Sequence, residues 1–375
     1  MLIRRTIYDD IKESVLKGDA VTILYGPRQA GKTTLIEQLR TELPQDLTYF
    51  VTGDDLRVQE VFGKTIESSL KSLLTGKKYL IIDEAQRIEN IGLTLKLIHD
   101  LLGLKILVSG SSSFDLANKV NEPLTGRTKT FFLYPLSWGE TQQNPDLRTN
   151  PEKIDNLLRF GCYPKSHLLT NEKDKEDYLY EVINNYLYRD LLSFDNIRKP
   201  KKIIELLSLL ALQIGNEVSI QHLSNDLGIT KVSVENYLDI LEKMFVLYNL
   251  RGFSRNLRSE VTKTSKYFFL DLGIRNALIR NFNPLNIRND TGGLFENIAV
   301  IERKKYLDNN RLGANLYFWR TYSQNEIDLL EEREGKIRAF EFKLKKGATS
   351  FKKFLGEYPN SESKLITPDN FYDLF

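Results

Sequence analysis

The sequence predicts an α/β protein in three parts: a parallel sheet with crossover helices, a mostly helical middle, and a second, smaller α/β unit. Three observations lead to this prediction. In residues 1–140, short apolar runs alternate with helical patterns, which is typical of a parallel sheet. Residues 152–250 carry apolar residues mainly at helical spacing, as in Ile203–Ile214. From Gly292 onward, one helical pattern precedes three strand-like runs.

The candidate strands of the first part are five short apolar runs. They are Val21–Tyr25, Thr48–Val51, Tyr79–Asp83, Lys105–Ser109 and Thr130–Leu133. A polar, turn-rich stretch from Gln142 to Pro151 follows them and indicates a boundary. We therefore expect domains at residues 1–140, 141–285 and 286–375.

Composition restricts the class of protein. The chain has 375 residues, of which 41% are hydrophobic and 27% charged, as in ordinary globular proteins, and its net charge of +3 does not by itself imply a polyanionic partner. No apolar run is long enough for a transmembrane helix, and the first residues do not resemble a signal peptide. Cys162 is the single cysteine, so no internal disulfide is possible, and we expect a reducing cytoplasm and no membrane partner.

A phosphate-binding loop lies between the first strand and the helical run that begins at Thr34. Residues 26–33 fit G-x-x-x-x-G-K-[ST] at every fixed position. Glycines let the backbone N–H groups surround the phosphates, Lys32 reaches the β- and γ-phosphates, and the Thr33 hydroxyl holds Mg²⁺. The expected nucleotide-binding residues are Gly26, Pro27, Arg28, Gln29, Ala30, Gly31, Lys32, Thr33, Thr34, Asp83 and Ser109.

An apolar run that ends in two carboxylates, Asp83 and Glu84, predicts the second nucleotide motif. Asp83 is expected near Mg²⁺, and Glu84 as the general base or water-positioning residue. The alternative is that the two carboxylates cap a helix that begins at Ala85. The presence of the phosphate-binding loop favours the functional interpretation.

Two further polar positions are candidates with open alternatives. Ser109 ends a strand and either senses the γ-phosphate or belongs to a serine-rich turn that caps the next helix. Arg127 is either a catalytic arginine, acting in cis or from a neighbouring subunit, or an ordinary surface residue.

Four segments in this order resemble a prokaryotic family of AAA+ ATPases that carry a C-terminal domain long called a domain of unknown function. They are Gly26–Thr34, Ile81–Gln86, Ser109–Ser113 and Leu124–Arg127. Gly161–Pro164 and Tyr188–Asp190 look like linking motifs of that family, although Cys162 stands where a second glycine is usual. The resemblance covers nearly the whole chain and implies a core sheet of the AAA+ type, with ATP and Mg²⁺ as cofactors.

In the middle of the chain, a helix, a short glycine-containing turn and a second helix precede a basic strand–loop–strand, and the whole resembles a winged helix, a DNA-binding module. Gln221–Leu227, a turn at Gly228 and Lys231–Met244 spell helix-turn-helix, with Thr230 as the N-cap of the second helix. Base contacts are expected from Lys231, Ser233, Val234 and Asn236, and phosphate contacts from Arg251, Arg255, Arg258, Lys263 and Lys266. The alternative is an interdomain packing module with solvated basic loops.

The last part has Glu296 on a predicted helix, Asp328 on a strand, and Glu341 and Lys343 as Glu-x-Lys on the next strand. This order resembles the PD-(D/E)XK nuclease fold, which is restriction-endonuclease-like. In this interpretation Asp328 and Glu341 bind a metal ion, Glu296 supports it from the helix, and Lys343 assists the nucleophile. The alternative is a charged, solvated strand pair, with Glu341 and Lys343 as a surface ion pair.

Two functions follow from this organisation. The first is an Mg²⁺-dependent ATPase that acts on DNA through a winged helix and a nuclease-like domain. The second is a nucleotide-switched regulator that binds DNA or protein and whose nuclease-like domain is inactive. The sequence leaves open whether the chain forms a homo-oligomer.

Overall fold

The computed structural model describes residues 2–111, 123–143, 150–188, 191, 199–253, 265–321, 325–345 and 347–375. The chain divides into two compact units: unit 1 contains Met1–Pro135 and Lys243–Phe245, and unit 2 contains Leu136–Glu242 and Val246–Phe375. Within the described residues, no helix is both long enough and apolar enough to cross a membrane.

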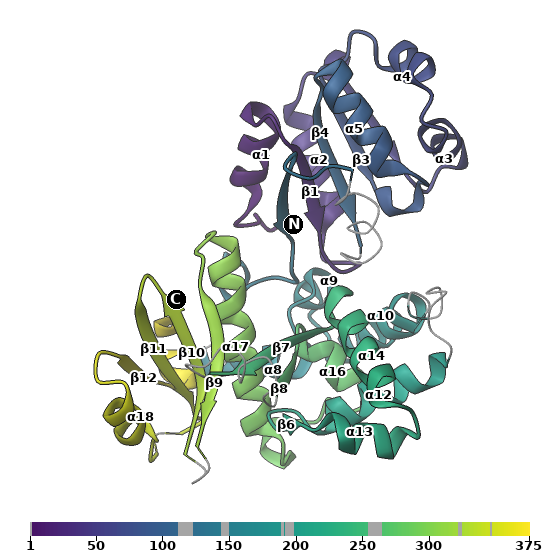
Figure 1. The fold of residues 1–375 in the computed structure, drawn as a ribbon. Coiled ribbons are helices and arrows are strands. Elements are labelled where there is room, and N and C mark those ends of the chain that lie inside the picture. Colours follow the sequence, from purple (N-terminus) through teal and green to yellow (C-terminus); the bar gives the residue numbers. More distant parts are fainter. Residues whose placement is uncertain are drawn as a thin grey trace. The chain divides into compact units, whose positions relative to one another are not determined.

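Unit 1 is a parallel sheet with helices, as expected from the alternating pattern (Figure 1). The strand order is β2-β3-β4-β1-β5, and every pairing is parallel. Its elements are α1 (Tyr8–Lys17), β1 (Val21–Tyr25), α2 (Lys32–Glu42), η1 (Gln45–Leu47), β2 (Thr48–Thr52), α3 (Leu56–Gly63), α4 (Glu67–Leu74), β3 (Tyr79–Asp83), η2 (Ala85–Arg87), α5 (Ile91–Leu102), β4 (Lys105–Gly110) and β5 (Thr128–Phe132).

The core of unit 1 explains the expected strands. All five residues of β1 and all five of β3 are buried, as in strands covered on both faces. Leu35, Ile36 and Leu39 on one face of α2 pack into the same core as Leu24 and Ile81. The five predicted strands are confirmed, with ends that differ by no more than two residues.

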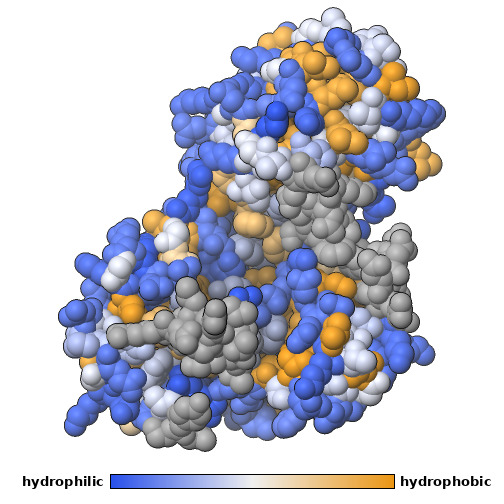
Figure 2. Space-filling model, in the orientation of Figure 1, coloured by the Kyte–Doolittle hydropathy of each residue, from blue (hydrophilic) through white to orange (hydrophobic). Residues whose placement is uncertain are grey.

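The helix α5 has one buried face and one exposed apolar side. Ile91, Leu95 and Ile98 are fully buried, whereas Leu93 and Leu101 are each 52% exposed. Figure 2 shows hydrophobic surface over this part of unit 1.

Unit 2 is a mixed α/β unit built on a seven-stranded sheet with the order β12-β11-β10-β9-β7-β8-β6. Its helices are α7 (Trp138–Thr141), α8 (Asn150–Phe160), α9 (Pro164–Leu168), α10 (Glu172–Val182), the π-helical turn η3 (Ile183–Leu187), α12 (Pro200–Leu212), α13 (Ile220–Leu227), α14 (Lys231–Lys243), α16 (Leu272–Leu278), η4 (Leu285–Ile287), α17 (Thr291–Asn309), α18 (Phe351–Glu357) and η5 (Pro368–Leu374). Its strands are β6 (Glu217–Val218), β7 (Leu247–Gly252), β8 (Ser265–Phe269), β9 (Asn315–Arg320), β10 (Glu326–Arg333), β11 (Lys336–Phe342) and β12 (Glu362–Ile366).

One sheet passes through both of the expected downstream parts. Arg251 and Gly252 of β7 pair in parallel with Tyr317 and Phe318 of β9. Residues 141–285 and 286–375 therefore do not separate into two compact units; they share one sheet within unit 2.

Buried charges attach the beginning of unit 2 to α17. Glu302 accepts a hydrogen bond from the backbone N–H of Trp138 at 2.5 Å, and Lys305 donates to the carbonyl oxygen of Leu136 at 3.0 Å. The two side chains also bond to each other at 2.8 Å. This pairing satisfies charges that would be costly to bury alone.

Candidate nucleotide site and carboxylate cluster

The predicted phosphate-binding loop joins β1 to α2 at the carboxyl edge of the parallel sheet (Figure 1). Lys32 is the first residue of α2, and its side chain is only 4% exposed. Its ammonium group donates to the carbonyl oxygens of Gly26 at 2.8 Å and Pro27 at 3.1 Å. The lysine charge is thus held over the loop itself, at the amino end of a helix, where anions bind favourably.

Two glycines of the loop are required by the backbone. A Cβ atom on Gly26 would lie 2.2 Å from the carbonyl oxygen of Leu133, which is an impossible contact. Gly31 has a φ of +98°, a conformation that side-chain-bearing residues rarely adopt. The glycine spacing therefore has a local structural cause as well as a functional one.

Among the other loop residues, Gln29 also has a positive φ of 66° and is exposed. Arg28 is half-buried, and Thr34 on the first turn of α2 is exposed. Pro27 and Ala30 are buried.

The magnesium-binding pair expected from the sequence lies together. The Thr33 hydroxyl, on the first turn of α2, donates at 2.7 Å to the carboxylate of Asp83, the last residue of β3. Ser109, at the end of β4, is fully buried and donates a short hydrogen bond to the other oxygen of Asp83. Two side chains from different segments, Thr33 and Ser109, therefore converge on the single carboxylate of Asp83.

Glu84 has a left-handed backbone with a φ of 51°. Its carboxylate makes no capping hydrogen bond to the turn η2, so the helix-capping alternative does not hold. The Gln86 side-chain amide donates to this carboxylate at 2.5 Å and to the Ser111 hydroxyl at 3.0 Å. Gln86 is not among the site residues expected from the sequence, although it stands only two residues after Glu84.

Arg127 lies at the amino ends of the strands, whereas the phosphate-binding loop lies at their carboxyl ends. Its carbonyl oxygen accepts from the N–H of Val21, the first residue of β1, whereas the phosphate-binding loop follows the last residue, Tyr25. Five strand residues span roughly 16 Å, which is beyond the reach of an arginine side chain. The expectation of a phosphate contact in cis is therefore wrong. The guanidinium instead pairs with Asp100 of α5 at 3.0 Å.

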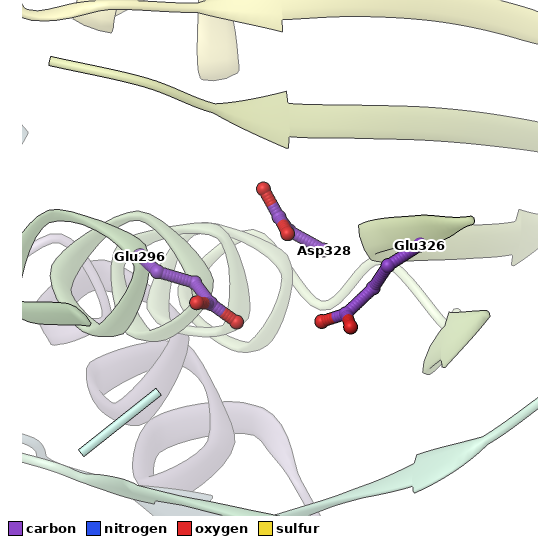
Figure 3. A group of neighbouring side chains, drawn as sticks. All are labelled: Glu296, Glu326 and Asp328. Atoms are coloured by element: carbon purple, nitrogen blue, oxygen red, sulfur yellow. The ribbon is translucent and has the colours of Figure 1, made fainter. Parts of the chain in front are cut away.

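A second cluster of carboxylates lies in unit 2. Glu296 on α17 and Glu326 and Asp328 on β10 point toward one another, and their ligand oxygens all lie within 4.8 Å (Figure 3). Residues 326 and 328 share one face of the strand because strand side chains alternate. Among the described residues, this is the one group of at least three acidic, histidine or cysteine side chains with metal-ligand spacing.

The cation beside this cluster is Lys266 of β8. Its side chain is 3% exposed, and its ammonium donates to Glu296 at 2.7 Å and, by a shorter hydrogen bond, to Glu326. Although burial alone would lower it, Glu296 and Glu326 hold the pKa of Lys266 above its ordinary value. The expectation that Lys266 contacts DNA phosphate is wrong, because the side chain is buried and paired.

The carboxylates of the cluster have unusual acidities. Burial, followed by the negative charge of Glu296, raises the pKa of Asp328 to about 8, although the backbone N–H of Phe342 donates to it at 2.8 Å. Burial likewise raises the pKa of Glu296. Perturbed acidities of this kind gather at functional sites, but structural charge networks produce them as well.

Glu341 and Lys343 differ from their expected places. Glu341 accepts from the backbone N–H of Ser350 at 2.5 Å and pairs with Lys343 at 3.4 Å, and it is not a member of the group formed by Glu296, Glu326 and Asp328. Lys343 donates a short hydrogen bond to the carbonyl oxygen of Ala348. Burial raises the pKa of Glu341. Glu326 and Lys266 thus take the places in the cluster that we had expected Glu341 and Lys343 to take.

The helix-turn-helix predicted from the sequence consists of α13, a turn at Gly228 with a φ of 62°, and α14. Thr230 caps α14 by accepting from the N–H of Ser233 at 3.2 Å. Lys231 and Asn236 are exposed, but Val234 is fully buried and therefore does not contact bases as expected. Of the expected basic wing, Arg251 is exposed, whereas Arg255, Arg258 and Lys263 lie outside the described residues.

Three parts of the chain match models of known protein families. Residues 18–142 match the model of an AAA domain, and residues 291–370 match a domain of unknown function, DUF4143. Residues 151–285 match a further domain of unknown function, DUF8612. The chain is thus similar to an AAA domain in its first part and to a DUF4143 region in its last part.

Relatives are similar to this chain over most of its length. An uncharacterized protein of Methanocaldococcus jannaschii is 26% identical over 336 residues, covering 84% of this chain and 73% of the relative. One of Mycobacterium tuberculosis is 28% identical over 328 residues, covering 86% and 70%.

AMPPCP-bound DnaA from Aquifex aeolicus has a TM-score of 0.32 and 16% identity, over 63% of this chain and 86% of that one. The Thermotoga maritima RuvB Holliday junction branch migration motor has the same TM-score and identity, over 64% and 88%.

Proposed function

We propose that unit 1 binds ATP with Mg²⁺ at the loop Gly26–Thr33 and hydrolyses it. The observation that carries this proposal is the convergence of Lys32, Thr33, Asp83 and Glu84 from separate segments at one edge of a parallel sheet. Ligands of open α/β sheets bind at the carboxyl ends of the strands.

The residues fit this ligand. Gly26 permits a close approach of the backbone that a Cβ would block, and the buried Lys32 ammonium supplies positive charge at the helix amino end. The Thr33 hydroxyl and Asp83 carboxylate are oxygen ligands of the kind that Mg²⁺ prefers. When bound, Mg²⁺ neutralises charge on the phosphate oxygens.

Each side chain has a separate role in the proposed reaction. Lys32 leaves the carbonyl oxygens of the loop and binds the β- and γ-phosphates. Glu84 orients the attacking water and accepts its proton. Ser109 and Thr33 keep the Asp83 carboxylate in one orientation.

Two substitutions in the full chain test this proposal. Lys32→Ala should abolish ATP binding in calorimetry, and Glu84→Gln should bind ATP but release phosphate at least about a hundredfold more slowly. Lys64→Ala, which removes an exposed lysine paired with Glu60, is the matched control and should behave as wild type. Wild-type hydrolysis by Glu84→Gln would show that another residue positions the water.

Arg127 is proposed to act on the nucleotide of a neighbouring copy of the chain. Its place at the amino edge of the sheet supports this role, because that edge is remote from its own phosphate-binding loop. Its partner Asp100 lies on α5, the helix that also exposes Leu93 and Leu101. Apolar side chains beside a charged residue are suited to a contact between copies.

Unit 2 is proposed to bind DNA through a winged helix. The order α12-β6-α13-α14-β7-β8, with β8 between β6 and β7 in an antiparallel arrangement, supports this assignment. Lys231 and Asn236 lie on the exposed side of α14, which is the second helix of the helix-turn-helix. Glu235 and Asp239 are exposed on the same helix and limit how closely it approaches phosphates.

The carboxylate cluster is the proposed metal site of a nuclease-like domain. Glu296, Glu326 and Asp328 supply oxygen ligands within reach of one ion, which is the specific observation favouring this second activity. Lys266 already balances part of their charge, so the metal must compete with its ammonium. If the Lys266 ammonium stays bound to these carboxylates and excludes the metal ion, the domain is an inactive recognition module, which is the alternative function.

A cleavage assay separates these alternatives. The full chain is incubated with single- and double-stranded DNA, ATP and either Mg²⁺ or Mn²⁺. Asp328→Asn and Glu326→Gln should both abolish cleavage, whereas Asp177→Asn, an exposed control paired with Lys173, should not. Metal binding without cleavage of any substrate would favour the regulator.

A further inference from the structure

The Arg5 side chain bridges two backbone segments at the candidate nucleotide site. Its guanidinium donates to the carbonyl oxygen of Ala30 at 2.7 Å and to that of Tyr134 at 2.6 Å. The side chain comes from the segment before α1 and is 8% exposed. Both acceptors are neutral carbonyl groups, so neither of these bonds neutralises the guanidinium charge.

The two carbonyl oxygens that accept from Arg5 belong to different parts of unit 1. Tyr134 follows Leu133, whose N–H is bonded to the carbonyl oxygen of Tyr25, so this part of the backbone is attached to the end of β1. Ala30 belongs to the phosphate-binding loop. Arg5 therefore links Ala30 of the phosphate-binding loop to Tyr134, whose backbone is held next to the end of β1.

Peptide geometry transmits this contact to the ligand side of the loop. In a planar trans peptide, the C=O of one residue and the N–H of the next point in opposite directions. With the Ala30 carbonyl held by Arg5, the N–H of Gly31 points away from the guanidinium. In such loops the backbone N–H groups surround the α- and β-phosphates.

We propose that Arg5 is a positioning residue of the nucleotide site, which holds the Ala30–Gly31 peptide so that the Gly31 N–H faces the β-phosphate. This inference rests on the proposed binding of ATP by the loop. The guanidinium also lies beside Gly31, since a Cβ on Gly31 would be 3.6 Å from the arginine nitrogen Nη1. Its permanent charge is thus placed at the phosphate-binding loop.

A purely structural role, in which Arg5 only attaches the N-terminal segment, predicts different behaviour. Ile3 and Ile7 on either side of Arg5 are already buried and attach that segment to unit 1. Loss of the arginine should therefore leave the segment in place and act on the loop.

The experiment compares Arg5→Ala, Arg5→Lys and Arg4→Ala in the full chain. Arg4 is the matched control, because its side chain is 68% exposed and pairs with Asp9 at the surface. Affinities for ATP, ADP and AMP are measured by calorimetry, with thermal unfolding and the KM and kcat of hydrolysis recorded in parallel.

Arg5→Ala should weaken ATP and ADP binding by about tenfold or more, since a buried hydrogen bond from a charged group is lost. AMP, which lacks the β-phosphate, should lose less than about threefold, and kcat should change less than KM because the contact is made in the ground state as well. Arg5→Lys keeps the positive charge but lacks the two separate guanidinium N–H donors, so its affinity for ATP and ADP should still be lower than that of wild type. Arg4→Ala should bind all three nucleotides as wild type does.

The outcomes separate this inference from the proposed function. If wild type binds no ATP, the proposed function fails; if wild type binds ATP and Arg5→Ala binds ATP and ADP equally well, only the role of Arg5 is overturned. Equal losses for ATP, ADP and AMP would overturn it too, because they would indicate general damage to the fold. If Arg5→Ala does not fold, the ADP-to-AMP affinity ratio of Arg5→Lys decides.

Discussion

The Thr33 hydroxyl donates to the Asp83 carboxylate at 2.7 Å across fifty positions of the chain. The contact exists because β1 and β3 are parallel strands on either side of β4, so that their carboxyl ends lie at one edge. A hydroxyl and a carboxylate so arranged give two oxygen ligands on the same side of a single ion.

Thr33→Ala should therefore raise the Mg²⁺ concentration needed for half-maximal hydrolysis and lower kcat by about tenfold or more, whereas Thr33→Ser, which keeps the hydroxyl, should stay close to wild type. The measurement is phosphate release at saturating ATP over a range of Mg²⁺ concentrations. Thr41→Ala is the control, because Thr41 is exposed near the other end of α2 and its hydroxyl only contacts the carbonyl oxygen of Gln38. An unchanged Mg²⁺ dependence in Thr33→Ala would remove Thr33 from the metal site.

Gln86 should affect the chemical step and not nucleotide affinity. Its amide holds the Glu84 carboxylate at 2.5 Å and is itself fixed by Ser111 at 3.0 Å. Gln86→Ala frees Glu84 to leave its orientation, so kcat should fall by about tenfold with KM nearly unchanged. Gln45→Ala, which removes an exposed glutamine that bonds only backbone carbonyls of its own segment, should leave both constants unchanged. A change confined to KM would contradict the assignment.

Arg127 should act between copies of the chain. Arg127→Ala should bind ATP normally but hydrolyse it at least about tenfold more slowly. Mixing Arg127→Ala with Lys32→Ala should restore activity in part, because the first variant offers an intact loop and the second an intact arginine. Arg57→Ala, which removes an exposed arginine paired with Asp55, is the control. A mixture no more active than the sum of its components would contradict action in trans.

Asp290 should stabilise unit 2, because its carboxylate pairs with two arginines. Arg288 donates to it at 2.7 and 2.8 Å, and Arg275, only 1% exposed, makes a short ion pair with the same carboxylate. Asp290→Asn leaves the buried Arg275 without this charge and should lower the free energy of unfolding by about 3–5 kcal/mol. Asp177→Asn, at an exposed pair, should change it by less than about 1 kcal/mol. The measurement is urea unfolding followed by circular dichroism.

The same carboxylate predicts a pH dependence. Burial alone would raise its pKa, but hydrogen bonds from Arg288 and Arg275 outweigh burial and lower the pKa of Asp290 from 3.8 to about 2. A carboxyl group with a lowered folded pKa contributes stability above its unfolded pKa, and this contribution disappears as the pH falls from about 4 to about 2. The difference in stability between wild type and Asp290→Asn should therefore shrink over that interval. A constant difference would contradict the assigned pKa.

Sequence patterns predicted the fold of unit 1 well because its strands are buried on both faces and read as continuous apolar runs, as in Tyr79–Asp83. They missed β12, whose five residues include an exposed glutamate, serine and lysine and so lack a strand signal. The parallel pairing of β7 with β9 was also invisible, since it rests on two residue pairs far apart in sequence.

The candidate sites were predictable where spacing is fixed by local backbone. The loop from Gly26 to Thr33 has this property, whereas the carboxylate cluster depends on tertiary placement. Glu326 stands two residues before Asp328 on a strand, which places both side chains on one face and could have indicated a shared site. Glu341 has the same two-residue spacing to Lys343, so spacing alone did not distinguish the two glutamates. Lys266 stands in a basic stretch of sequence, and nothing in that stretch distinguishes a buried lysine from a solvated one.

The seven-stranded sheet has a mechanical consequence. Because β7 and β9 pair in this sheet, we expect the helix-turn-helix segment next to β7 and the carboxylate cluster next to β9 to move together. A motion that repositions the helix-turn-helix should therefore reposition the carboxylate cluster as well. If a change of nucleotide state moves unit 2, the distance from α14 to Asp328 should stay constant.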